Sequence, residues 1–387
     1  MRAGPGQTVA GRYLVTDRPE PADPLGTRRL AVDGRTGTRV QLEALELPEL
    51  LVPELAGSAD FESSRWLDPA GVLAEVATVI ADSPPHARLR QSFDVAAEAG
   101  LIWVVEEEPT DSALPALLAD GPLPPYRAAE VAADLARALQ AVHAGGRAHG
   151  NLVARQVTLG EDGAALLGGQ AIGAAEEALA RVLGGADGRR WAQARAGLVG
   201  ACAERWPPEL LAEAGEGGGA GARPAPAFGP AGDSWALGVL LQRMLTGQGP
   251  FPEQSPIALF AAVRAARRTG AEGCGVLRPL VERLLAPAPA DRPTAAEARG
   301  WLGGLLVGVP EPYRAAPAEP AVLPVLRPSW PLVRRPRGER AAPVTEHARH
   351  ARTRGGGRRA TLLPVLLVGG VLGAMVLAMA AVVLLAG

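Results

Sequence analysis

The last 27 residues of the chain, TLLPVLLVGGVLGAMVLAMAAVVLLAG (361–387), contain no charged side chain. As a helix they would be about 40 Å long at 1.5 Å per residue, and the hydrocarbon core of a bilayer requires about 30 Å. A buried core helix rarely needs so long an uncharged run. The sequence therefore predicts one transmembrane helix over residues 361–387.

The segment before this run is rich in proline and arginine. Residues 311–387 contain 11 Arg and four acidic residues, whereas residues 1–310 contain 28 Arg and 37 acidic residues. Basic residues beside a span mark its cytoplasmic side, so we expect a cytoplasmic head, a single-pass anchor in the cell membrane and a C-terminus at the outer face. Residues 311–360 have no apolar period and are expected to form an extended juxtamembrane linker. Their arginines are expected to contact anionic membrane lipid. The alternative is that they are a plain topology signal, and both can hold.

Two glycines in the predicted span, Gly369 and Gly373, have the spacing that lets two helices approach closely. They indicate a possible homodimer through the membrane. Because glycine is common in spans, they can also be incidental, and a Gly373→Ile span that associates equally well would exclude dimerisation. The basic run adjoins the membrane and lacks interleaved aromatic residues, so no nucleic-acid partner is expected. The N-terminus has no apolar run typical of a signal peptide.

Apolar residues make up 48% of the chain, enough for a sizeable core. The runs RYLVT (12–16), RVQLEALEL (39–47) and LIWVVEEE (101–108) predict strands, and the Pro/Gly-rich residues 17–38 predict turns. Apolar spacing predicts helices at 69–80, 126–144, 233–246, 257–268 and 277–286. A Gly/Pro/Ala-rich stretch at 215–232 predicts a mobile loop. A small β-rich part is therefore expected to precede a larger helical part.

Several segments occur in an order that resembles the bacterial membrane-anchored Ser/Thr protein kinases. The entry GRY (11–13) is followed by LARALQAVHAGGRAHGNL (135–152), WPPELL (206–211), DSWALGVLLQRMLTGQGPF (233–251) and LLAPAPADRPTAAEARGWL (284–302). The resemblance covers roughly residues 11–303. It implies an α+β, two-lobed protein-kinase-like fold, with a small β-rich N-lobe at 1–108 and a large helical C-lobe at 109–310, followed by the linker and one transmembrane helix.

The resemblance also implies structural roles for six residues. Glu209 and Arg292 would form an ion pair inside the large lobe, whereas the simpler alternative is that both are surface charges. Asp233 would accept hydrogen bonds from the backbone around His149, and His149 and Leu152 would pack in the core. Glu75 would stand at the position of the helix glutamate, facing a second negative charge at Glu43.

The residues that phosphoryl transfer requires are replaced. The chain contains no lysine, and the position of the strand lysine that binds phosphates is Glu43. The catalytic loop reads HGNLVARQ (149–156), so Asn151 replaces the proton-accepting Asp and Gln156 replaces a magnesium ligand. Gly169 replaces the main metal-binding Asp, and Gly150 the arginine that grips a phosphorylated loop. Prolines and acids replace the glycine-rich loop.

These losses together predict a pseudokinase that binds protein partners, without catalysis, metal or cofactor. ATP could still bind without catalysis, because residues 106–108 occupy the expected adenine-contacting segment. Two other functions remain open. One is a divergent Ser/Thr kinase that uses other acids such as Asp162 or Asp187, and detectable phosphate transfer would support it. The other is a membrane-organising protein that acts mainly through its span. The two cysteines, Cys202 and Cys274, are expected to be reduced, without a metal site.

Overall fold

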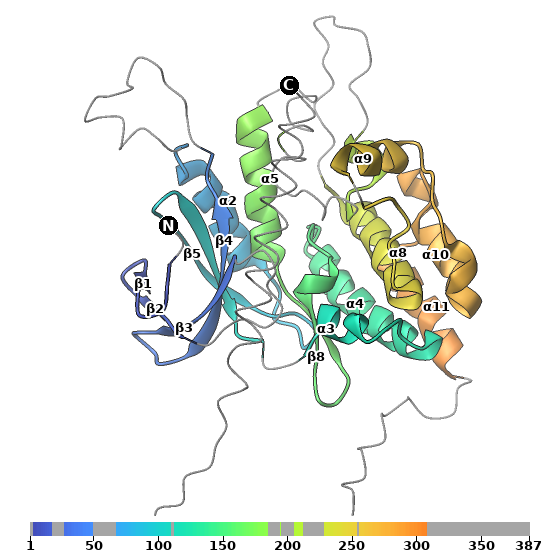
Figure 1. Ribbon diagram of the computed structural model, residues 1–387, viewed down its shortest axis with the longest axis horizontal. Coiled ribbons are helices and arrows are strands. Elements are labelled where there is room, and N and C mark those ends of the chain that lie inside the picture. The colour runs from blue at the N-terminus through green and yellow to red at the C-terminus, as the bar shows by residue number, and fades with distance from the viewer. Residues whose placement is uncertain are drawn as a thin grey trace, which may run out of the picture. The chain divides into compact units, whose positions relative to one another are not determined.

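The computed structural model describes residues 3–17, 27–48, 67–109, 112–184, 194, 205–211, 228–253 and 255–307. All of the described residues belong to one compact unit. This unit is a mixed α/β structure in which a curled antiparallel sheet is followed along the chain by a group of helices (Figure 1).

Six strands form the main sheet in the order β1-β2-β3-β4-β6-β5. They are β1 Thr8–Val9, β2 Tyr13–Val15, β3 Arg28–Asp33, β4 Arg39–Glu46, β5 Ser92–Glu98 and β6 Leu101–Glu107. The strands predicted at 12–16, 39–47 and 101–108 are confirmed to within one residue at each end. Within residues 17–38 a turn is present at 34–36, as predicted, but the strand β3 was not predicted; it pairs with β2 on one side and β4 on the other.

The side chains of the central strands alternate between two apolar clusters. Leu101, Trp103 and Val105 of β6 pack with residues of β1, β2 and β3. Ile102 and Val104 instead pack with α2 (Ala70–Asp82) and α5 (Gln170–Gly184). One face of the sheet is therefore covered by these two helices, which lie beside the strands in Figure 1.

Side-chain contacts join the two ends of the sheet. The hydroxyl of Tyr13 on β2 donates to Asp94 on β5 at 2.7 Å. The backbone N–H of Ala10 donates to the Glu98 carboxylate at 2.5 Å. The sheet is thus curled, with its first strands close to its last one.

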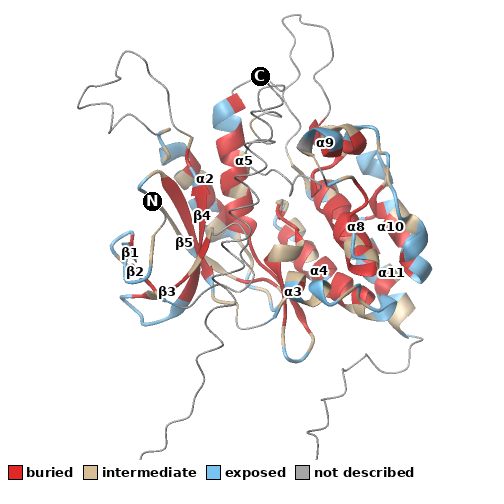
Figure 2. Cartoon of the chain, viewed as in Figure 1, coloured by how far each residue is buried: buried red, intermediate tan, exposed pale blue. Residues whose placement is uncertain are grey.

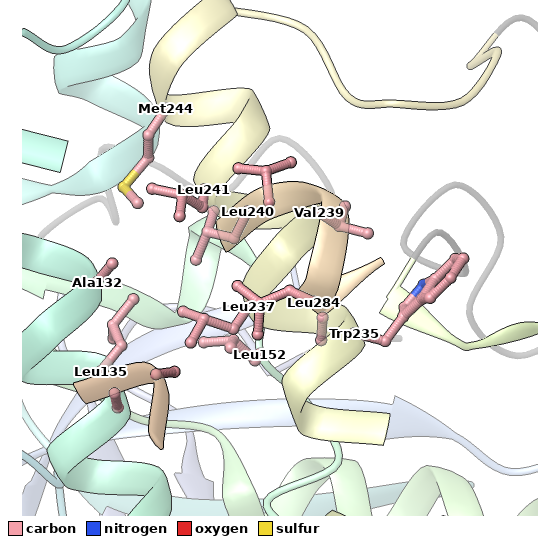
Figure 3. Packing of buried hydrophobic residues seen from close by; sticks show 14 of the residues in the cluster. Ala132, Leu135, Leu152, Trp235, Leu237, Val239, Leu240, Leu241, Met244 and Leu284 are labelled. Atoms are coloured by element: carbon pink, nitrogen blue, oxygen red, sulfur yellow. The ribbon is translucent and has the colours of Figure 1, made fainter. Parts of the chain in front are cut away.

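The helical part is built around α8, Pro230–Thr246, which is buried along most of its length (Figure 2). A proline in its first turn and the left-handed Gly247 just past its end account for its bounds. Figure 3 shows Leu237 and Leu241 of α8 on the side of Leu135 and Leu152, whereas the ring of Trp235 points away from them; all five belong to one apolar cluster. The remaining helices are α3 Leu114–Ala119, α4 Pro125–Ala144, α7 Pro208–Leu211, α9 Pro256–Arg264, α10 Arg278–Leu284 and α11 Ala295–Val307.

The five predicted helices are present, although α9 ends four residues earlier than expected. Pro230–Gly232 belong to α8 rather than to the predicted loop, whose residues 215–227 lie outside the described ranges. The sequence GEDG (160–163), between the apolar runs VTL and AALL, predicts a hairpin. It is confirmed, since β8 Val157–Leu159 pairs antiparallel with β9 Ala165–Leu167. A short strand, β7 Ser112–Ala113, adds to β8.

Within the described ranges no helix is long and apolar enough to cross a bilayer. The predicted linker at 311–360 and the predicted span at 361–387, with Gly369 and Gly373, lie outside those ranges.

Candidate functional site

Glu43 lies at the centre of a buried ionic network on the helix-covered face of the sheet. It stands opposite Arg28 of β3 in the strand register, with Arg28 Nη2 3.3 Å from its Oε2. Arg155, from the short 3-10 helix η2 (Ala154–Gln156), places Nη1 3.2 Å from Oε1, and Gln156 Nε2 donates to Oε2 at 3.0 Å. Burial alone would raise the pKa of Glu43, but Arg28, Arg155 and Gln156 hold it below its ordinary value.

Gln156 connects Glu43 to a second buried ion pair. Its Oε1 accepts from Arg90 Nη2 at 3.4 Å, and Nη2 also lies 3.0 Å from Glu106 Oε2. Arg90 Nη1 donates to Gln41 Oε1 at 2.9 Å. Burial raises the pKa of Glu106, an effect that Arg90 and the N–H of Gly169 oppose. Residue 106, expected in the adenine-contacting segment, thus directs its side chain into the protein interior.

Gly168 and Gly169 have no side chains, and this makes room for Arg90 and Gln156 of the network. A Cβ at Gly168 would overlap the guanidinium of Arg90, and a Cβ at Gly169 would overlap the carboxamide of Gln156. Gly169 has a φ of +82°, and its N–H donates to Glu106 Oε1 at 2.7 Å. Gln156 and Gly169 stand at the two positions where the resemblance leads us to expect metal ligands. The side chain of Gln156 packs against the backbone of Gly169.

Asn151 is fully buried beneath the first turn of α5. Its Nδ2 donates to the carbonyl of Gly169 at 3.0 Å, and a Cβ at Gly173 of α5 would overlap its own Cβ. A neutral carboxamide cannot accept a proton as a general base. The position expected to hold the catalytic base is thus chemically inert and covered by a helix.

Asp233 holds the backbone around His149, as the resemblance implies. Its buried carboxylate accepts from the N–H of His149 at 2.7 Å and from that of Gly150 at 2.9 Å. A third contact, to His143 Nε2 at 2.8 Å, was not foreseen from the sequence. His149 and Leu152 are both buried, in agreement with their expected core positions.

Glu209 and Arg292 form the expected ion pair. The guanidinium donates to both carboxylate oxygens at 2.7 Å, and the arginine side chain is fully buried. The alternative that these are two independent surface charges is therefore wrong.

Glu75 does not face Glu43, which corrects the expectation from the sequence. Glu75 lies on the half-exposed side of α2 and pairs with Arg181 of α5. The acidic neighbour of Glu43 is instead Glu106, from the neighbouring strand β6. Strand alternation explains this, because both residues point to the covered face of the sheet.

His149 is expected to make stability depend on pH. Burial lowers its pKa to about 4, with Arg205 and His143 adding to this effect and Asp233 opposing it. The unfolded chain, with an ordinary histidine pKa of about 6.5, binds the proton first as the pH falls. The stabilisation from His149 is therefore complete above pH 6.5 and lost towards pH 4, by about 2–3 kcal/mol between pH 6.5 and 4.5.

The measurement is the free energy of unfolding of His149→Asn and of wild type across this pH window. The variant should have a flatter profile. His86→Asn is the matched control, because the Nδ1 of His86 also accepts the N–H two residues ahead, yet His86 is not buried. Parallel profiles for His149→Asn and wild type would contradict the prediction.

Glu43 and Gln156 were predicted from the sequence as site positions, whereas Arg28, Arg90 and Arg155 were not. Glu43 was singled out only as the position of the strand lysine, and RVQLEALEL carries no signal for the three arginines, which lie in other segments. Among the described residues, no group of three or more His, Cys, Asp or Glu side chains could hold a metal ion. Cys274 is free and buried, and Cys202 lies outside the described ranges.

The chain was also compared with known proteins. Neither the protein-family models nor the curated proteins gave a match to it.

Proposed function

We propose that this chain is a membrane-anchored, protein-kinase-like regulator without phosphotransfer activity, that is, a pseudokinase. In this proposal the strands and α2 form the small lobe, residues 109–310 form the helical lobe, and residues 311–360 connect them to a span at 361–387. Its role is to present a fixed surface to signalling proteins at the cytoplasmic side of the cell membrane. Retention of the full chain in carbonate-washed membranes, and release of a chain ending at residue 310, tests the anchor.

Two internal contacts support the resemblance on which the proposal rests. Asp233 bonds to the backbone N–H groups of His149 and Gly150. Arg292 pairs with Glu209 although 82 residues separate them. The kinase resemblance implies both interactions as supports of the catalytic loop. In this proposal the supports are kept, although the residues expected to react are replaced.

One observation carries the proposal. Charged side chains of the protein itself occupy the place where a kinase would bind the nucleotide phosphates. Glu43 replaces the phosphate-binding lysine; Arg28 and Arg155 already neutralise its charge, and Gln156 donates a hydrogen bond to it. A nucleotide phosphate would meet this carboxylate and would have to displace it. Positioning and charge neutralisation supply nearly all catalysis of phosphoryl transfer, and the described residues at the expected lysine, base and metal positions do not offer them.

The alternative is a divergent kinase that uses other acids. Asp162 is exposed in the turn between β8 and β9, where it accepts the N–H of Ala164 at 2.9 Å. This is an ordinary turn contact rather than the environment of a tuned base. Asp187 lies outside the described ranges.

We expect millimolar ATP with Mg²⁺ to leave the thermal unfolding midpoint of the full-length chain unchanged. A ligand at 100 times its dissociation constant adds about 2.7 kcal/mol, which should move the midpoint by several degrees. The controls are Mg²⁺ alone and ATP without Mg²⁺ at the same ionic strength. A shift that requires both, together with phosphate transfer to the chain or to a protein substrate, would overturn the proposal and favour the divergent kinase.

A further inference from the structure

The side chains around Glu43 form a set of donors suited to an oxyanion. Two guanidinium groups and one carboxamide place nitrogens between 3.0 and 3.3 Å from its carboxylate oxygens. Guanidinium groups bind carboxylates and phosphates more strongly than neutral donors do. The Glu43 carboxylate is therefore surrounded by the same kinds of donors that bind a free anion.

The charge around this carboxylate is predominantly positive. Arg28 and Arg155 contact it directly, and Arg90 is linked to it through Gln156. The other buried acid, Glu106, is engaged by Arg90 and by the N–H of Gly169. Without Glu43, three buried or partly buried guanidinium groups would face a single carboxylate. An unbalanced buried charge is costly, so this region would attract an anion.

The donors come from distant parts of the chain. Arg28 lies on β3, whereas Arg155 and Gln156 lie on η2. Arg28 Nη1 also donates to the carbonyl of Arg155 at 2.9 Å. A carboxylate bound at this point therefore ties the sheet to the segment that leads into the β8–β9 hairpin.

We infer that Arg28, Arg155 and Gln156 form an oxyanion-binding site whose resident ligand is the chain's own Glu43, so that the sheet and η2 are held together without an external anion. The ligand class is a carboxylate or phosphate oxyanion. The inference depends only on this geometry and stands whether or not the chain is a pseudokinase.

The test is chemical rescue of Glu43→Ala in the full-length chain. This substitution removes a group with the size and charge of acetate, so sodium acetate is the probe and sodium chloride of equal ionic strength is the reference. In chloride the variant should unfold about 10 °C below wild type, since it leaves buried guanidinium groups uncompensated. Acetate should restore a large part of that loss with a saturable dependence on concentration.

Three controls locate the effect. Glu43→Gln keeps the volume filled and should show no acetate response, like wild type. Glu75→Ala removes a half-exposed carboxylate from its pair with Arg181 and should also show none. Adding Arg155→Ala to Glu43→Ala should abolish the rescue.

The inference is overturned if Glu43→Ala responds to acetate no more than Glu75→Ala does, or if rescue survives the loss of Arg155. If Glu43→Ala folds poorly, the yield of folded chain in acetate and in chloride becomes the readout. Equal yields, including failure to fold in either salt, count against the inference. The response of wild type to ATP has no bearing on this result, so the two proposals can fail separately.

Discussion

Replacing Arg292 with alanine is expected to lower the free energy of unfolding by about 3–5 kcal/mol, the cost of breaking a buried ion pair. The side chain is fully buried, and all five of its N–H donors are used. Two go to Glu209, and the others go to the carbonyls of Ala286, Ala231 and Pro287. The guanidinium also lies 5.1 Å from the centre of the Trp235 ring. Alanine would leave all of these acceptors without their donor.

Arg292→Lys tests how much of this stabilisation comes from the positive charge and how much from the shape of the guanidinium. A lysine keeps the positive charge but has three donors on a single nitrogen, so it cannot serve five acceptors at once. We expect it to recover less than half of the loss in a denaturant titration of the full-length chain. Arg278→Ala, which breaks an exposed pair with Glu282, should leave the midpoint nearly unchanged. A lysine variant as stable as wild type would show that charge alone matters there.

Local patterns were sufficient to predict much of the helical part. Helix α4 has small and apolar residues repeated at helical spacing after Pro125, and its predicted range was wrong by only one residue. The hairpin at β8 and β9 was evident from a Gly-rich turn between two apolar runs. The pair between Glu209 and Arg292 could be anticipated because both residues belong to recognisable motifs.

Elements without a clear local pattern were missed. β3 begins with two arginines after a Pro/Gly-rich segment, so its sequence resembles a turn; its core residues, Leu30 and Ala31, are packed by β2 and β4. β5 is an edge strand whose residues are mostly half-exposed, which weakens the apolar alternation. Helix α5 contains glycines and many alanines, and its burial against α2 stabilises it.

The ionic network at the candidate site could not be read from the sequence. Glu43, Arg90 and Gln156 are far apart in the chain, and in the fold Gln156 contacts both of the others. Each residue taken alone resembles an ordinary surface charge or amide. The sequence showed which residues stand at the positions that the kinase resemblance singles out, but not which side chains surround them.

Gly169→Asp, which restores the expected metal-binding carboxylate, should destabilise the protein by about 4 kcal/mol or more without producing phosphotransfer. Its Cβ would overlap the carboxamide of Gln156. Its charge would lie beside Glu106, which accepts the N–H of Gly169 itself. The added carboxylate would therefore enter a site already filled with side chains and already containing two acids. Unfolding of the full-length chain and binding of Mg²⁺ are the two measurements.

Two alanine variants divide this cost into its parts. Gly169→Ala and Gly37→Ala both place a Cβ on a backbone with positive φ, +82° and +72°, so both bear the same conformational penalty of about 1–2 kcal/mol. Gly37 has open space around it, whereas Gly169 abuts Gln156. We expect Gly169→Ala to cost about 1–3 kcal/mol more than Gly37→Ala, the usual effect of overpacking. If the two cost the same, Gln156 can move aside, position 169 is open to a side chain, and a metal-binding acid there would be structurally permitted.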